Sequence, residues 1–282
     1  MPCSPCRARR HRLLLAALLS LLILPAPRAA AVEVDDLLRK ARLPDTAMLQ
    51  LRQAANRAET TGVPAPQIRA VLERALAREV PPGYIERYLG AAAQAAQAGV
   101  PVTAVTNKLL EGLAKGADPQ SIAQAATSLT TSLQTARGVV DEAARNGFRS
   151  RRPAARLGAM SHVASALQRG ATEAQLRELV AAGRQGRRTI EELGAAAEAL
   201  GELLQRRFPA PGSVRLLVAA LERRYRRGDL ARVNRALSEA ARDGTPAPDE
   251  LLALATREIS RGRKSQDVVR ALRRVRAERP GR

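Results

Sequence analysis

The sequence has 282 residues, a formal net charge of +20 and only 2% aromatic residues, with no tryptophan. Both cysteines, Cys3 and Cys6, lie in an N-terminal segment that we expect to be removed. The mature chain would then form no disulfide and offer no thiolate to a substrate or a metal ion, which excludes disulfide-stapled folds and thiol enzymes. The roughly 250 remaining residues suffice for one large domain or two small ones.

Residues 1–31 have the three parts of a secretory signal peptide. Four arginines precede an apolar run over 13–24, and three alanines over 29–31 favour cleavage before Val32. The run is shorter than the roughly 20 residues needed to cross a bilayer. An Arg-rich transit peptide is the alternative, but the run is uniformly apolar instead of amphipathic. An exported chain without disulfides suits a bacterial envelope, so we expect a periplasmic or extracellular protein.

The mature chain is predicted to be all-α. Good helix formers dominate its composition, and period-two runs of β-branched residues are missing. Short amphipathic helices are expected over 34–42 and 45–60 at the start of the N-terminal part, residues 32–147.

A repeat follows at an offset of 37 residues. Gly62-Val63-Pro64 recurs as Gly99-Val100-Pro101, and Pro82 and Ile85 recur as Pro119 and Ile122. Each copy reads as two antiparallel helices, over 66–79 and 83–97 and then over 102–115 and 119–146. A fixed period of this size predicts an array of α-hairpins, similar to an α-solenoid. The aromatic residues of tetratricopeptide repeats and the turn of ankyrin repeats are both missing.

The segment 118–146 is predicted to be one long helix with an apolar seam. Asp118 can cap its start, Pro119 suits its first turn, and Gly147 can end it. The seam has heptad spacing and consists of Ile122, Ala126, Leu129, Leu133, Ala136, Val140 and Ala143. The opposite face holds Ser, Thr and Gln. The sequence leaves open whether the seam packs within the chain or against a second copy.

A basic link over 148–153 separates the N-terminal part from a basic C-terminal part, residues 154–282, although the two can also form one continuous array. In the C-terminal part, helices are expected over 154–169, 172–184, 189–207, 213–227, 229–242, 248–261 and 265–279. Thr172 with Gln175, and Thr189 with Glu192, are predicted to form capping boxes at two of these helix starts. The 37-residue register is not evident in these residues.

Nearly all of the charge excess lies in the second half of the chain. Residues 32–148 carry a net charge of +1, whereas residues 149–282 carry +14. A coding bias toward arginine can account for part of this excess, but not for its uneven distribution. Two basic amphipathic helices are expected, over 213–227 and 265–279, and such helices can bind an anionic surface. The candidate anion-binding residues are Arg215, Arg223, Arg224, Arg226, Arg227, Arg270, Arg273, Arg274 and Arg276. The competing interpretation is that these helices pack through their apolar sides and that the arginines are merely solvated.

No residue pattern predicts catalysis, a cofactor or a metal site. His162 is the single histidine of the mature chain. The carboxylates of the mature chain lie beside arginines on the expected helix faces. No glycine-rich loop between a strand and a helix is present to hold a phosphate. An enzyme with two catalytic carboxylates remains open, because sequence does not show their separation.

The leading hypothesis is an exported, noncatalytic α-helical repeat protein that binds or scaffolds an envelope protein or peptide. The alternative is an electrostatic binder of anionic envelope material, either lipid headgroups or an acidic polymer, through the basic C-terminal part. Sequence-specific binding of nucleic acid is disfavoured, because no zinc finger or aromatic RNA-binding motif is found. The sequence does not reveal the oligomeric state.

Overall fold

The computed structural model describes residues 27–150, 152–184, 188–242 and 247–277, and over these ranges the protein is all-α. Its helices are α1 (Pro27–Lys40), α2 (Asp45–Thr60), α3 (Ala65–Leu76), α4 (Pro82–Gln97), α5 (Val102–Lys115), α6 (Pro119–Arg145), α7 (Pro153–Gln168), α8 (Glu173–Gly183), α9 (Ile190–Gln205), α10 (Ala210–Glu222), α11 (Arg227–Ala241), α12 (Pro248–Ser260) and α13 (Ser265–Ala277). None of the helices in these ranges is both long and apolar enough to span a lipid bilayer.

Most of the expected export signal, residues 1–26, lies outside the described residues. Helix α1 begins at Pro27, so the expected cleavage position before Val32 falls within this helix. Cleavage there stays a prediction.

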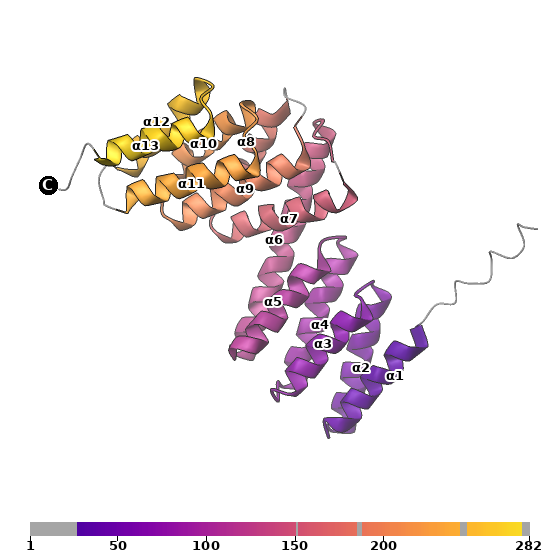
Figure 1. Ribbon diagram of the computed structural model, residues 1–282. Coiled ribbons are helices and arrows are strands. Elements are labelled where there is room, and N and C mark those ends of the chain that lie inside the picture. The colour runs from indigo at the N-terminus through magenta and orange to yellow at the C-terminus, as the bar shows by residue number, and fades with distance from the viewer. Residues whose placement is uncertain (1–26, 151, 185–187, 243–246, 278–282) are drawn as a thin grey trace, which may run out of the picture.

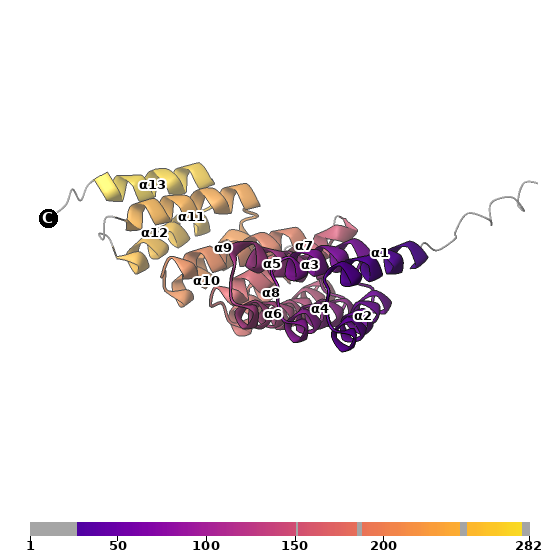
Figure 2. The same cartoon turned by 90° about the horizontal axis from the view of Figure 1, so that it is seen from below.

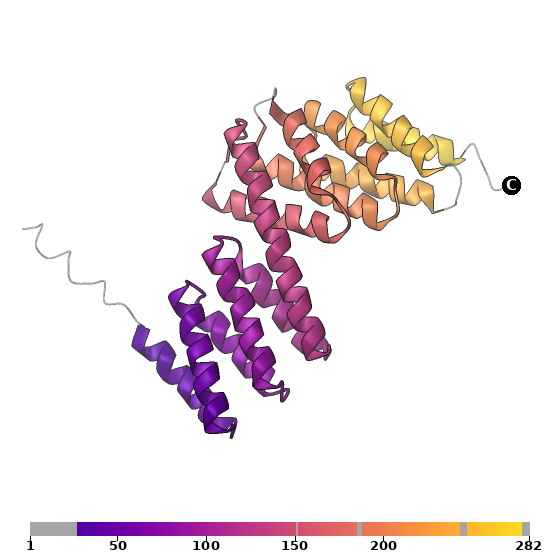
Figure 3. The ribbon, with the colours of Figure 1, turned by 180° about the vertical axis from the view of Figure 1, so that it is seen from behind.

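The helices lie in two rows (Figures 1 and 2). The even-numbered helices α2, α4, α6, α8, α10 and α12 pack one against the next. The odd-numbered helices pack in the same way from α1 to α5 and from α7 to α13, but the described helices α5 and α7 do not pack along each other. Helix α6 therefore joins the two stretches, because its partners include α4 and α5 as well as α7 and α8. Figure 3 shows this long helix running from one stretch into the other.

The 37-residue spacing extends into the C-terminal part, where the sequence had not revealed it. Helices α7, α9 and α11 begin at residues 153, 190 and 227, which are 37 residues apart each time, and α8 and α10 begin at 173 and 210. Helix α13 follows α11 after 38 residues, at 265. The spacing was hidden because the starting residues are Pro, Ile, Arg and Ser, and because glycines do not mark equivalent turns.

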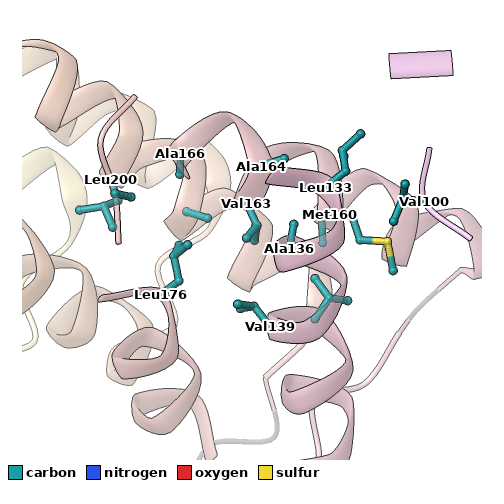
Figure 4. Close-up of a cluster of buried hydrophobic side chains, with 14 of the residues drawn as sticks. Val100, Leu133, Ala136, Val139, Met160, Val163, Ala164, Ala166, Leu176 and Leu200 are labelled. Atoms are coloured by element: carbon teal, nitrogen blue, oxygen red, sulfur yellow. The ribbon is translucent and has the colours of Figure 1, made fainter. Parts of the chain in front are cut away.

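The predicted seam of α6 packs within the chain. Six of its seven residues are buried, and Leu129 is half-buried against the core. Figure 4 shows Leu133 of α6 close to Met160 of α7 and Val100 of the loop before α5. The seam thus contributes to the core on which both stretches of the array pack.

The basic link is held by its neighbours at its N-terminal end. Phe148 is buried, and the Arg149 main chain pairs with the segment before α9: Arg149 N–H donates to the Arg188 carbonyl at 2.8 Å, and Ile190 N–H donates to the Arg149 carbonyl at 2.9 Å. Residue 151 lies outside the described part.

Candidate functional site

The structure does not contain the single helix over 213–227 that the sequence had predicted: α10 ends before residue 227, and α11 begins there. Helix α10 begins at Ala210, because proline is tolerated in a first helical turn, and it ends at Glu222. Arg224 then takes a left-handed conformation with φ of 61°, and Tyr225 N–H bonds back to the Ala220 carbonyl at 3.0 Å. This is a Schellman-type helix end made without glycine, which is why the sequence did not reveal it.

The arginines of the two predicted basic helices do not share one face. Arg215 is exposed on α10, in the even-numbered row, whereas Arg270, Arg273 and Arg274 are exposed on α13, in the odd-numbered row. Arg270 pairs with Asp267 of its own helix. Arg276 lies in α13, but its side chain is outside the described part.

The other four candidates lie in or beside the turn between α10 and α11. Arg223 donates from its guanidinium to the carbonyl of Ser260, the last residue of α12. Arg227 pairs with Glu198 of α9 at 2.9 Å, and Arg226 N–H donates to Asp229 at 3.1 Å. The turn is thereby tied to the helices on both sides of it.

Arginines reach helix C-termini at three further places. Arg188 donates to the Glu222 carbonyl of α10 at 2.8 Å. Arg78 donates to the Leu113 carbonyl near the end of α5, and Arg137 to the Ala98 carbonyl after α4. The last carbonyls of a helix lack partners and carry its negative dipole end, so a guanidinium there is stabilising. Part of the arginine content therefore holds neighbouring helix pairs together, a role that the sequence did not reveal.

A basic depression, which we call the rim hollow, lies between the α10–α11 and α12–α13 turns. It has a volume of about 620 Å³. Its lining residues with charged or hydroxyl side chains are Arg223, Arg224, Tyr225, Asp229, Arg232, Arg263, Lys264 and Ser265. The structure thus brings two candidates, Arg223 and Arg224, together with three cations that the sequence analysis had not selected.

Hydrogen bonds fix the walls of the rim hollow. Tyr225 donates its hydroxyl proton to the Arg263 carbonyl at 2.5 Å, and Ser265 donates to Asp229 at 2.6 Å. Burial raises the pKa of Tyr225 to about 12, with a further contribution from the negative charge of Asp229. The pKa of Asp229 is lowered overall: burial opposes this, but hydrogen bonds from Ser265 and the Arg226 main chain outweigh it.

A second depression, the α7–α9 hollow, lies over the odd-numbered row and has a volume of about 390 Å³. Its lining includes the small residues Gly158, Ala159, Gly194 and Ala195. A Cβ atom on Gly194 would lie 3.2 Å from the Ala159 Cα atom, so glycine allows α9 to approach α7 closely.

Charged side chains of both signs surround the α7–α9 hollow. Arg226 and Arg227 lie at the α11 end, and Glu191, Glu192 and His162 are also part of the lining. His162 Nδ1 is 3.7 Å from Glu198, the carboxylate that also binds Arg227. Glu192 and Thr189 form the predicted capping box of α9, so this carboxylate is engaged at the helix start.

A third depression, of about 570 Å³, lies between α4 and α6 and is lined by small residues, uncharged polar residues and Arg87. Gln94, Gln120, Gln124, Thr127 and Ser128 contribute to it, which places the predicted Ser, Thr and Gln face of α6 on the surface. Thr127 donates to the Ala123 carbonyl one turn earlier at 3.0 Å.

Comparison of the chain with models of known protein families, and with proteins of curated function, finds no match. Within the described ranges, no three His, Cys, Asp or Glu side chains lie close enough together to hold a metal ion.

Proposed function

We propose that this chain is an exported, noncatalytic α-helical repeat protein, an α-solenoid-like array of antiparallel helix pairs, that binds a segment of an envelope protein. The single observation that carries this proposal is the α7–α9 hollow, with its small-residue lining open to the surface and charges of both signs around it. Clefts between helix pairs are sites where helical proteins hold peptide segments.

The lining of the hollow suits an apolar side chain flanked by charged residues. The apolar side chain would cover Ala155 and Gly158, which are not buried, and release water from them, which favours binding. Acidic and basic residues of the same segment would then meet Arg226 and Glu191 at the edge of the hollow. A volume of about 390 Å³ lies at the small end of the usual range for binding pockets, so it would hold one or two side chains.

Two glycines provide a matched pair of variants for a test. Gly158 lines the hollow, and Gly138 lies elsewhere on the exposed surface of α6. A Cβ atom would meet nothing within 4 Å at either position, and both glycines are exposed, so a larger side chain can be introduced at both. Gly158→Leu fills the hollow, whereas Gly138→Leu adds the same apolar group outside it.

The experiment selects peptides from a random display library on the protein purified after export in a bacterial host, and measures their affinities for the two variants. We expect Gly158→Leu to weaken the selected peptides at least about tenfold, because several apolar contacts are lost, and Gly138→Leu to leave them unchanged. Equal affinities for both variants, or no peptide selected, would reject the hollow as a peptide site.

The alternative function, electrostatic binding of anionic envelope material, is favoured by one observation, the cations gathered around the rim hollow. The two functions differ in their dependence on salt. Binding to anionic vesicles or heparin through exposed charges should weaken steeply as salt screens them, whereas binding in the α7–α9 hollow should change little.

A further inference from the structure

The rim hollow concentrates positive charge in a small volume. Five cationic side chains line it, and Asp229 is the single carboxylate among the lining residues. The cations are Arg223, Arg224, Arg232, Arg263 and Lys264. Their charges add in a concave site, because field lines are focused there and ions of opposite sign are attracted more strongly than to a flat surface.

Asp229 does not neutralise the whole cluster, because its oxygens are engaged inside the fold. It accepts hydrogen bonds from Ser265 at 2.6 Å and from Arg226 N–H at 3.1 Å, and it pairs with Arg232 at 2.9 Å. Two of the other cations, Arg263 and Lys264, are weakly compensated. Arg263 has Glu258 at 4.0 Å, and no ion-pair partner of Lys264 is found among the described residues.

Parts of the rim hollow are also held in place before any ligand arrives. Arg223 is fixed by the Ser260 carbonyl, and the main chain of Arg263 is fixed by the Tyr225 hydroxyl. Helix α13 begins at Ser265 in the lining of the hollow, so the positive end of its dipole adds to the field there. A site arranged in advance loses little conformational entropy on binding.

We propose that the rim hollow binds a compact, multiply charged phosphate group. Its volume of about 620 Å³ exceeds the size of one phosphate and accommodates two linked phosphates or a phosphate-bearing headgroup. The arginines offer paired N–H donors that match phosphate oxygens, and Lys264 offers a point charge. This inference is independent of the proposed peptide site, because the two hollows share no lining residue.

Two double variants of equal charge test the proposal. Arg263→Gln with Lys264→Gln removes two cations of the hollow, and Arg273→Gln with Arg274→Gln removes two exposed cations of α13 that do not line it. All four side chains are exposed, so we expect both variants to keep the melting temperature of the parent.

The probe is pyrophosphate, titrated calorimetrically at low and at moderate salt. We expect the first variant to bind at least about tenfold more weakly than the parent, and the second to differ less than about twofold. Equal losses in both variants would show a general charge effect and overturn the proposal. Absence of pyrophosphate binding to the parent protein would overturn it as well.

Vesicles of phosphatidic acid and phosphatidylcholine identify the source of the phosphate, because the phosphomonoester of phosphatidic acid can carry two negative charges. If the protein sediments with the anionic vesicles and pyrophosphate releases it from them, the hollow binds lipid headgroups. Binding of pyrophosphate without vesicle binding would assign it to a soluble phosphate compound. Gly158→Leu should bind pyrophosphate like the parent, so failure of the peptide site and failure of the phosphate site can be told apart.

Discussion

The ring of Phe148, in the segment after α6, lies directly against Gly183, the last residue of α8. A Cβ atom placed on Gly183 would stand 2.0 Å from the Phe148 Cζ atom, far closer than two carbon atoms can approach. Phe148 is buried, so its ring is enclosed by other atoms of the fold. The contact joins the segment that follows the long helix to the C-terminal part of the array.

We therefore predict that Gly183→Ala lowers the free energy of unfolding by about 1–3 kcal/mol, the usual cost of overpacking a core. The control is Gly158→Ala, where the added methyl group meets nothing within 4 Å. It should raise stability by about 0.5–1 kcal/mol, because alanine favours the helix more than glycine does. Urea denaturation of both variants checks the prediction.

A double variant separates steric overlap from other effects of the new methyl group. In a Phe148→Ala background the ring is gone, so Gly183→Ala should cost much less than in the parent. An unchanged cost in that background would contradict the steric explanation.

The features of the fold that follow from local patterns could be predicted from the sequence. The heptad seam of α6 and its Asp118 cap are examples: the Asp118 carboxylate accepts the Ser121 N–H at 2.9 Å. The capping boxes at Thr172 and Thr189 are also present as predicted. Apolar spacing and capping residues act over a few positions, so one sequence suffices to recognise them.

The roles of the arginines could not be predicted, because they depend on residues about one repeat away. Arg223 meets Ser260 and Arg188 meets Glu222 only because successive helix pairs stack. Arg263 and Lys264 were missed for the same reason. They precede α13 as Tyr225 and Arg226 precede α11, but this equivalence is visible only once the helix starts are known.

We predict that Arg188→Ala destabilises the protein by about 1–3 kcal/mol, because it removes a charge-assisted hydrogen bond to a helix C-terminus. Arg188 is only 5% exposed, and burial lowers the pKa of its guanidinium group. Arg215→Ala, on an exposed face of α10, should change the free energy of unfolding by less than about 0.5 kcal/mol. If urea denaturation gives the same free energy of unfolding for both variants, a structural role for Arg188 is disproved.

The two buried tyrosines should make the fold sensitive to alkaline pH. Tyr88 donates to the Pro119 carbonyl at 3.0 Å, and burial, followed by the charge of Asp118, raises its pKa to about 12. Burial likewise raises the pKa of Tyr225 to about 12. The folded state therefore holds these protons more tightly than the unfolded state, whose tyrosines have a pKa of about 10.

It follows that the stabilisation from each tyrosine is complete below about pH 10 and is lost as pH rises through about 12, a change of about 1–3 kcal/mol per group. Denaturation curves over this pH range should show the fall in the free energy of unfolding. The fall should be smaller in the double variant Tyr88→Phe with Tyr225→Phe. A Tyr84→Phe variant leaves only these two tyrosines. Its tyrosinate absorbance should then rise near pH 12, and a rise near pH 10 would refute the prediction.

Leu133 lies where α6 passes from one stretch of the array to the other, and it is completely buried. Leu133→Ala should lower the free energy of unfolding by about 2–5 kcal/mol, because it removes buried contacts and leaves a cavity. Leu129→Ala should cost less, because Leu129 is only half-buried.

The position of Leu133 adds a second expected outcome. Because α6 packs on helices of both stretches, loss of the Leu133 contacts should weaken their coupling as well as the local core. Amide hydrogen exchange should then show reduced protection in α4 and α5 and also in α7 and α8. Reduced protection on one side of α6 alone would show that the two stretches unfold independently and that the shared helix does not couple them.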